Sequence, residues 1–446
     1  MTDAALTTSA ASRAWSSGRR AFDVVGLRRN EATFAVGGLV VIGVHVVDDN
    51  FLQPQPGASA GDHLVSGLVP LVLLALAVTV YRRGQGARRA VVALVTGVFG
   101  VVAGGEAAYY TIDGGPSGDD YTGLAALAAG ITLIAVAGVT LWKTRRMEGS
   151  RSRRYLLRAL IAVAAAAIAF AVALPLGVAY IGTHVGRLPA DNIDFGPTAE
   201  SVTLTTSDGV ELAASYIPSR NRAAVIAFPG RSGPQTQARM LARHGYGVLL
   251  FDQRGDGDSQ GDPNALGWDG ERDVLAAVAY LKRRHDVDPR RIGGIGLSVG
   301  GEILLQTAAH TQDLRAVVSE GAGSRSVGEE LERSGAGKWL GDIQISAVLS
   351  AGMTVFSNHL PPPHLNDLVP KIAPRSIFLI YTTHGVDTED LNPVYFRAAH
   401  EPKTIWKIPE ASHTGGIEAR PHEYERRVVG FFDHALLGPP TSRGAA

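Results

Sequence analysis

Residues 292–301 read Ile-Gly-Gly-Ile-Gly-Leu-Ser-Val-Gly-Gly, an apolar run followed by a serine set among glycines. The run 292–297 has the content of a buried strand, and residues 299–310 have helical spacing. The pattern G-x-S-x-G at such a strand-to-helix junction forces the serine into a strained backbone conformation that exposes its hydroxyl. The helix that follows also presents its amino end to a developing oxyanion. We therefore predict that Ser298 is a nucleophile.

Strand-like and helical segments alternate on both sides of this stretch, from residue 198 to residue 438. Such alternation predicts a mostly parallel sheet that is covered by helices on both faces. The expected elements are a hairpin over 201–217, strands at 224–228, 247–251 and 376–381, and helices at 235–244 and 271–285. The stretch 322–374 is an insertion with helical segments at 327–333 and 339–356.

Three further motifs occur in order along this half of the chain. They are Phe-Pro-Gly-Arg-Ser-Gly at 228–233, Asp-Gln-Arg-Gly-Asp-Gly-Asp-Ser at 252–259 and Ala-Ser-His-Thr-Gly at 411–415. Together with the serine motif they resemble the α/β-hydrolase superfamily, and the resemblance covers about residues 198 to 437. It implies an α/β-hydrolase fold in which the insertion 322–374 forms a helical cap over the active site.

The resemblance also implies roles for individual residues. His413 matches the general base, and the backbone amides of Val299 and Arg231 match the oxyanion hole. The acid of the triad is expected in the loop after the strand 376–381, where three carboxylates follow one another closely. Asp387 fits the placement of the family best, Glu389 is a rival and Asp390 is third, because either type of carboxylate can orient an imidazole.

The N-terminal half is a different kind of sequence, dominated by Ala, Val, Leu, Gly and Ile. Its apolar stretches are long enough to cross a hydrocarbon core of about 30 Å. We expect about five transmembrane helices, at residues 32–47, 63–81, 90–109, 121–142 and 155–183. The fold class is therefore an α-helical membrane bundle followed by an α/β domain.

Arginine and lysine residues alternate between the predicted loops. They are frequent in the tail 1–31, in the loop around 82–89 and in the stretch 143–154, and they are absent from the loops 48–62 and 110–120. Cytoplasmic loops collect positive charge, so this pattern predicts a cytoplasmic tail at 1–31. With five crossings of the cell membrane, the linker 184–197, the hydrolase domain 198–438 and the tail 439–446 are expected to be extracytoplasmic.

Composition narrows the function further. The 446-residue chain contains no cysteine, which excludes disulfides, thiolate metal sites and a cysteine nucleophile. Its formal net charge is zero, so no global field attracts nucleic acid. We expect no metal or other cofactor, and a small-molecule or lipid-like acyl substrate.

The leading hypothesis is a membrane-anchored serine hydrolase that cleaves an ester, thioester or amide through an acyl-enzyme intermediate. An acyltransferase would use the same residues. A peptidase is a further option, for which no peptide-specific pocket is legible. The non-enzyme alternative is a membrane sensor or scaffold whose hydrolase-like domain binds a ligand without turnover.

Overall fold

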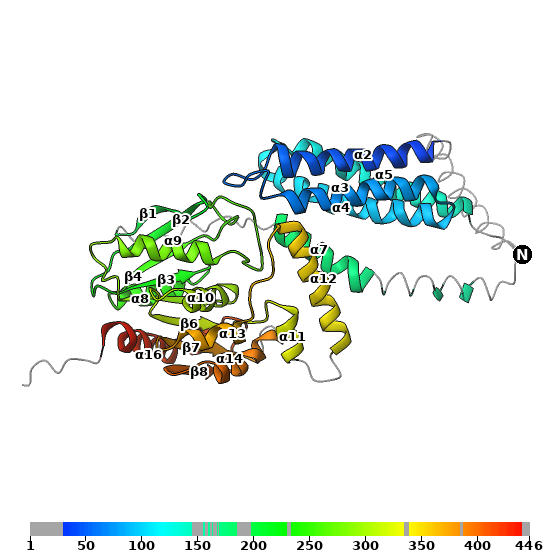
Figure 1. Cartoon of the computed structure of the whole chain (residues 1–446). Coiled ribbons are helices and arrows are strands. Elements are labelled where there is room, and N and C mark those ends of the chain that lie inside the picture. Colours follow the sequence, from blue (N-terminus) through cyan, green and yellow to red (C-terminus); the bar gives the residue numbers. More distant parts are fainter. Residues whose placement is uncertain are drawn as a thin grey trace, which may run out of the picture. The chain divides into compact units, whose positions relative to one another are not determined.

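The computed structural model describes residues 30–144, 169–184, 198–229, 233–333, 339–383 and 387–438, together with a few residues between 155 and 167. The chain divides into two compact units (Figure 1). One comprises Met1–Pro54 and Ser59–Ala167, and the other Gln55–Ala58 and Ile168–Ala446. Each unit has hydrophobic clusters of its own.

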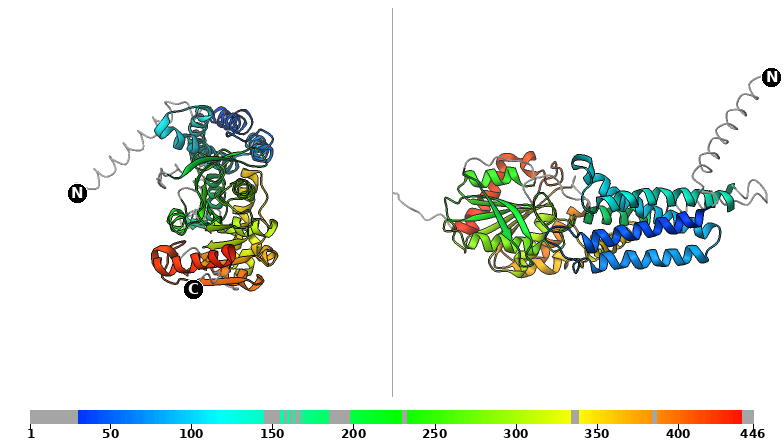
Figure 2. Two further views of the ribbon diagram at one scale, coloured as in Figure 1. Left: turned by 90° about the vertical axis from the view of Figure 1, so that its left-hand side faces the viewer. Right: turned by 90° about the horizontal axis from the view of Figure 1, so that it is seen from above.

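The first unit is a bundle of long helices that run side by side (Figure 2). They are α2 (Glu31–Val47), α3 (Leu64–Arg83), α4 (Ala87–Gly114) and α5 (Asp120–Thr144). Within the described residues, four segments are long and apolar enough to cross a membrane: Glu31–Leu52, Leu64–Arg83, Ala87–Ile112 and Asp120–Lys143. They overlap the first four predicted spans. Of the fifth, 155–183, the structure describes residues 169–183 and a few residues before them, and Ala171–His184 is a shorter apolar helix.

Glycines allow α4 and α5 to approach each other closely. A Cβ atom on Gly104 would lie 2.4 Å from the carbonyl oxygen of Gly123, and one on Gly130 would lie 2.6 Å from that of Gly97. Such backbone approach between small residues is typical of helix contacts in membranes, where tight packing replaces the hydrophobic effect. The outward surface of the bundle is apolar, with side chains such as Val72 and Val95 more than half exposed.

The second unit contains an eight-stranded sheet in the order β1-β2-β4-β3-β5-β6-β7-β8. The first three strands in this order pair antiparallel, and every later pair is parallel. The strands are β1 (Glu200–Thr205), β2 (Glu211–Ile217), β3 (Ala224–Phe228), β4 (Gly247–Phe251), β5 (Ile292–Leu297), β6 (Ala316–Glu320), β7 (Ser376–Tyr381) and β8 (Lys403–Lys407). The mostly parallel sheet predicted from the sequence is confirmed.

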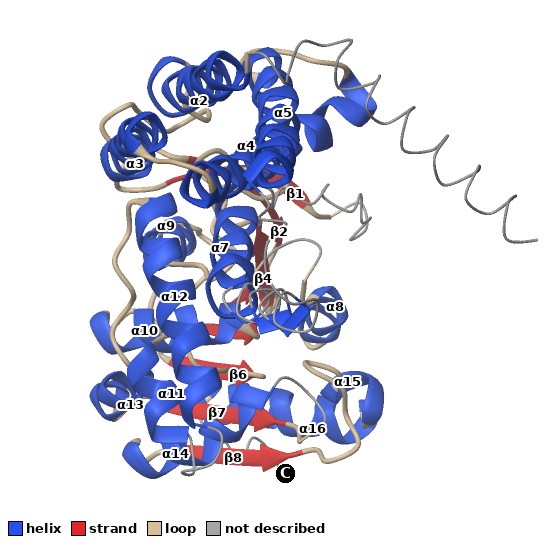
Figure 3. Cartoon of the chain, turned by 90° about the vertical axis from the view of Figure 1, so that its right-hand side faces the viewer, coloured by secondary structure: helices blue, strands red, loops and turns tan. Residues whose placement is uncertain are grey.

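Helices cover both faces of this sheet (Figure 3). One face carries α9 (Glu271–Lys282), α10 (Val299–His310), α13 (Leu365–Leu368) and α14 (Asn392–Ala398), and the other carries α8 (Gln235–Arg243) and α16 (Pro421–Phe432). The central strands β3, β4 and β6 are consequently buried from end to end, which explains why β3 and β4 are continuous apolar runs rather than alternating ones.

The predicted insertion contains α11 (Val327–Arg333) and α12 (Trp339–Ser357) between β6 and β7. Helix α12 packs against α7 (Leu174–His184), which precedes the sheet in the chain and belongs to the same compact unit. Their contact is close, because a Cβ atom on Gly352 would lie 2.7 Å from the Cβ of Ala179. An edge-on contact joins the Tyr180 and Phe356 rings, whose centroids lie 5.3 Å apart.

Candidate active site

Ser298 lies at the sharp junction between β5 and α10. Its φ of 52° is in the left-handed region, which a residue with a side chain seldom adopts. The backbone N–H of Ser298 donates to the carbonyl of Glu320 at 2.7 Å, which fixes the turn to the end of β6. The strain predicted for this position is therefore present, and the surrounding sheet holds it in place.

The motif requires glycine at positions 296 and 300 because a side chain at either position would clash with nearby backbone atoms. A Cβ atom on Gly296 would lie 2.5 Å from backbone atoms of Gly300, and one on Gly300 would lie 2.7 Å from the carbonyl oxygen of Phe228. Contacts this short with backbone are not relieved by a side-chain movement. The strand and the helix can therefore approach at Ser298 only if both positions lack side chains.

His413 lies beside the serine. Its Nε2 atom is 2.9 Å from the Oγ atom of Ser298, a hydrogen-bond distance across 115 positions of the sequence. The imidazole is 31% exposed, so the pair remains accessible to a small molecule. Residues 411–415 follow β8 and contain His413, as the motif in the sequence indicates.

The other imidazole nitrogen, Nδ1, lies 2.6 Å from Oε1 of Glu389. Glu389 is buried, and its second oxygen accepts the backbone N–H of Thr382 at 3.0 Å. Thr382 also donates its hydroxyl to the carbonyl of Ala411, two residues before His413. One residue thus orients the carboxylate and supports the histidine loop.

The preference for Asp387 over Glu389 requires correction. All three acidic residues lie in the 3₁₀ helix η4 (Asp387–Leu391), and the side chain of Asp387 is outside the part that the structure describes. Glu389 occupies the hydrogen-bonding position at Nδ1, and Asp390 is exposed. Successive residues of a 3₁₀ helix project in directions about 120° apart, so neighbouring acids do not face the same imidazole.

The oxyanion-hole residues are only partly described. Val299 is the first residue of α10, where backbone N–H groups have no partner within the helix and point toward an incoming anion. This position agrees with the role that the resemblance implies for Val299. Arg231 lies outside the described residues, which stop at 229 and resume at 233.

Two buried carboxyls lie beside the proposed triad without belonging to it. Burial raises the pKa of Glu302 to about 7, against the opposing effect of Arg325, and burial likewise raises the pKa of Glu320 to about 7. Glu302 accepts the backbone N–H of Gly323 at 2.8 Å. The sequence motifs gave no indication of Glu302, Glu320 or Thr382, because each acts through partners far away in the chain.

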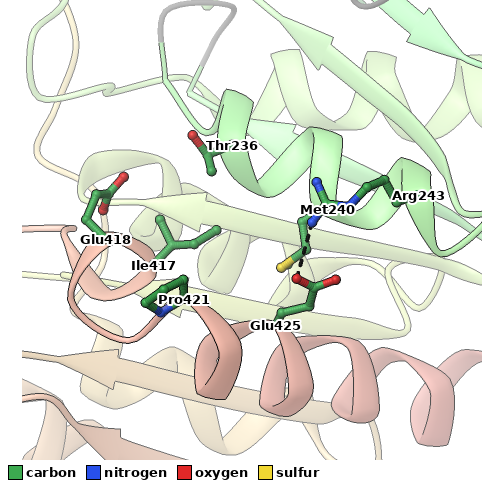
Figure 4. Close-up of a pocket in the computed structure, with 7 residues that line it drawn as sticks. All are labelled: Thr236, Met240, Arg243, Ile417, Glu418, Pro421 and Glu425. Atoms are coloured by element: carbon green, nitrogen blue, oxygen red, sulfur yellow. Dashed lines mark hydrogen bonds and ion pairs between the residues drawn. The ribbon is translucent and has the colours of Figure 1, made fainter.

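A cavity of about 150 Å³ lies on the opposite face of the unit from α9 and α10, between α8 and the corner formed by α15 (Gly416–Ala419) and α16 (Figure 4). Its polar rim includes the ion pair of Arg243 with Glu425, at 3.2 Å. The lining residues are Thr236, Met240, Arg243, Ile417, Glu418, Pro421 and Glu425. Ser298 and His413 do not line this cavity. Within the described residues, no cluster of three or more His, Cys, Asp or Glu is placed to hold a metal ion.

Comparison with known proteins extends this description. The model of the X-Pro dipeptidyl-peptidase (S15) family matches residues 197–372. The protein YfhR of Salmonella typhi, itself uncharacterized, is 26% identical over 271 residues, which cover 55% of this chain and 86% of YfhR. The thiohydrolase aneE of Aspergillus aculeatus is 29% identical over 131 residues, covering 27% of this chain and 41% of aneE.

Among solved structures, the α/β hydrolase GrgF from Penicillium sp. sh18 aligns with 54% of this chain and 99% of its own length, at 19% identity and a TM-score of 0.45. The strand order, the strained serine between β5 and α10 and the family match agree with one another. On these grounds the second compact unit is a domain of the α/β-hydrolase superfamily, and the chain is a serine hydrolase.

Proposed function

We propose that this chain is a membrane-anchored serine esterase that works through an acyl-enzyme intermediate with Ser298, His413 and Glu389 as its triad. The observation that carries the proposal is the unbroken path of contacts from Ser298 Oγ through both imidazole nitrogens to the buried Glu389. This is the arrangement that nucleophilic catalysis by serine requires.

The geometry supports a two-step reaction. Ser298 Oγ attacks the acyl carbon while its proton passes to Nε2 of His413, and the resulting oxyanion faces the Val299 amide. The imidazolium then gives that proton to the leaving alcohol, and an acyl-serine ester remains. In the second step a water molecule attacks this ester while His413 takes its proton, and His413 then returns that proton to Ser298 Oγ as the acid is released. Glu389 holds the Nδ1–H throughout and stabilises the imidazolium.

We propose that the substrate is a lipid-like acyl ester. Helix α7 exposes a stripe of large apolar side chains, Leu174, Val178 and Ile181, at helical spacing. It forms the end of the fifth predicted span, and the cap helix α12 packs directly on it. A cap held against the end of a membrane segment would lie at the bilayer surface, where acyl lipids are concentrated.

The proposed topology has the tail 1–31 in the cytoplasm, five crossings within 32–183, and the domain 198–438 outside. It rests on the arginine pattern and on the four long apolar helices. A reporter fused after Ala446 should report an extracytoplasmic location. One inserted in the 82–89 loop should report a cytoplasmic location. A cytoplasmic signal from the C-terminal reporter would mean that the number of crossings is even.

One observation favours a second candidate, release of X-Pro dipeptides from peptides, because the matching family model is that of the X-Pro dipeptidyl-peptidases (S15). The two functions use the same triad and differ in the leaving group. Purified full-length protein assayed with p-nitrophenyl acyl esters and with an X-Pro p-nitroanilide separates them. We expect the esters to be turned over faster, and a reversed ratio would favour the peptidase.

The experiment that tests the chemistry is covalent labelling of the full-length protein in detergent with a fluorophosphonate probe. The wild type should be labelled, and Ser298→Ala should not be. Ser412→Ala is the matched control, since Ser412 is exposed in the loop next to His413 and, among the described residues, no base forms a hydrogen bond with its hydroxyl. Labelling that persists in Ser298→Ala, or a wild type that never reacts, would overturn the proposal.

A further inference from the structure

Glu320 connects the nucleophile to the histidine loop. It is the last residue of β6, it is buried, and its carbonyl oxygen accepts the backbone N–H of Ser298. Its position in the backbone is therefore fixed relative to the serine. The side chain of Glu320 takes no part in the proton path described above.

The carboxylate of Glu320 accepts two hydrogen bonds from the segment after His413. Oε1 accepts the backbone N–H of Gly416 at 2.7 Å, and Oε2 accepts the hydroxyl of Tyr424 at 2.6 Å. Gly416 begins α15, three residues after the histidine, and Tyr424 is fully buried in α16. Hydrogen bonds to an ionised acceptor are shorter and stronger than neutral ones.

These bonds restrain the histidine loop on the side that Thr382 does not reach. Thr382 binds the carbonyl of Ala411 before His413, and Glu320 binds the amide of Gly416 after it. The neighbouring Gly321 also borders the imidazole, because a Cβ atom there would lie 3.1 Å from Cε1 of His413. The end of β6 thus supports both the loop and the ring.

A cavity borders the outer side of the same corner. Ile417 of α15 and Pro421 of α16 line this cavity, which lies between the corner and α8 (Figure 4). The two hydrogen bonds of Glu320 reach the corner from its inner side.

We propose that Glu320 is a positioning residue for the reaction: by holding Gly416 and Tyr424, its carboxylate keeps Nε2 of His413 within hydrogen-bond distance of Ser298 Oγ. The inference rests on the proposed roles of Ser298 and His413. It assigns Glu320 no contact with substrate.

The energetic cost of Glu320 supports a role in function rather than in stability. Burial raises its pKa to about 7, and within the described residues it forms no ion pair. A buried carboxylate without a cation is costly, and this cost offsets part of the stability that its two hydrogen bonds provide. Replacement of Glu320 should accordingly affect turnover more than stability. Replacement of a residue with a purely structural role would have the reverse effect.

The test compares Glu320→Leu and Glu320→Gln with a matched control in the full-length protein. Asp286 is the control, because it also accepts a tyrosine hydroxyl, from Tyr216, and a backbone N–H, from Ser219, both at 2.8 Å. For each variant we would measure kcat and KM on a short acyl ester, the labelling rate of Ser298 by fluorophosphonate, and Tm.

Misplacement of a catalytic group by about 1 Å can cost on the order of 10²-fold. Glu320→Leu should therefore lower kcat and the labelling rate by about that factor, with KM changed by less than about threefold and Tm maintained. Glu320→Gln keeps an acceptor for Gly416 and should recover part of the loss. Asp286→Asn should keep the wild-type kcat and labelling rate.

A second pair of variants covers the case in which Glu320→Leu does not fold. Tyr424→Phe removes one donor and should reduce kcat by about tenfold, in line with the loss of one charge-assisted hydrogen bond. Tyr246→Phe, which removes a similar bond from a buried tyrosine to Asp433, should not. If the wild type is labelled but the Glu320 and Tyr424 variants keep the wild-type kcat, the role of Glu320 is overturned while the proposed function stands. Absence of labelling in the wild type would overturn the proposed function and the inference with it.

Discussion

Two polar networks of the catalytic unit, the one around His413 and the one around Arg254, use similar groups for different purposes. Arg254 contacts three carboxylates, those of Asp208, Asp269 and Asp273, at 2.7 to 3.1 Å. It fixes the turn after β4 to the β1–β2 hairpin and to α9. In the His413 network the buried carboxylate of Glu389 orients an imidazole that is 31% exposed and ends at the hydroxyl of Ser298.

The difference lies in where each network ends. The Arg254 guanidinium is enclosed by acceptors, and its side chain is 10% exposed, so its interactions can only hold the fold. Ser298 has a strained backbone conformation and is only half-buried, so its hydroxyl can react. Variants in the two networks should therefore separate catalysis from stability.

The largest effect on activity is expected for His413→Ala. Removal of the base in a serine triad costs on the order of 10⁶ in kcat, because the nucleophile is no longer activated. We expect such a loss in ester hydrolysis, with Tm close to that of the wild type. The control is His422→Ala, which changes an exposed histidine on α16 and should leave kcat unchanged. Activity in His413→Ala within tenfold of the wild type would contradict the triad.

The largest effect on stability is expected for Arg254→Met. Asp273 is fully buried, and loss of its cation leaves an uncompensated charge, which typically costs about 3–5 kcal/mol. Denaturant or thermal unfolding measures the change, while kcat per folded molecule should be retained. Arg290→Met is the control, because Arg290 is 86% exposed and pairs with Asp288 at the surface. If Arg254→Met were as stable as Arg290→Met, the Arg254 network would not have the stabilising role that distinguishes it from the His413 network.

A smaller, pH-dependent effect is expected at Glu302. Burial raises its pKa from 4.5 to about 7, so between these pH values the folded chain binds more protons than the unfolded chain. The free energy of unfolding contributed by this group therefore falls as pH rises through that window, by up to about 3 kcal/mol. Glu302→Gln lacks this dependence and should gain in Tm relative to the wild type from pH 5 to pH 7. Parallel Tm profiles would show that Glu302 does not titrate there.

The proposed nucleophile and base, Ser298 and His413, could be selected from the sequence because each lies in a short motif with a local physical cause. The elbow needs Gly296 and Gly300 for backbone approach, and the continuous apolar strand before it is visible in the sequence as well. The parallel sheet was predictable for the same reason, since strands buried on both faces are unbroken apolar runs.

The proposed acid and the residues proposed to support the site were not predictable in the same way. Asp387, Glu389 and Asp390 share one short 3₁₀ helix, and the choice among them depends on which direction faces the imidazole. Glu389 is selected by its bond to Thr382 as well as by His413. Glu320 reaches Gly416 and Tyr424 about 100 positions later, and no local pattern encodes such a contact.

The role of Glu389 as the triad acid is tested most directly by comparing kcat of Glu389→Gln with kcat of Asp387→Asn in the full-length protein. If Glu389 holds the imidazole in the tautomer that accepts the serine proton, Glu389→Gln should lose on the order of 10⁴ in kcat with little change in Tm. Asp387→Asn should remain near the wild type. The reverse result, a crippled Asp387→Asn beside an active Glu389→Gln, would contradict the triad Ser298–His413–Glu389.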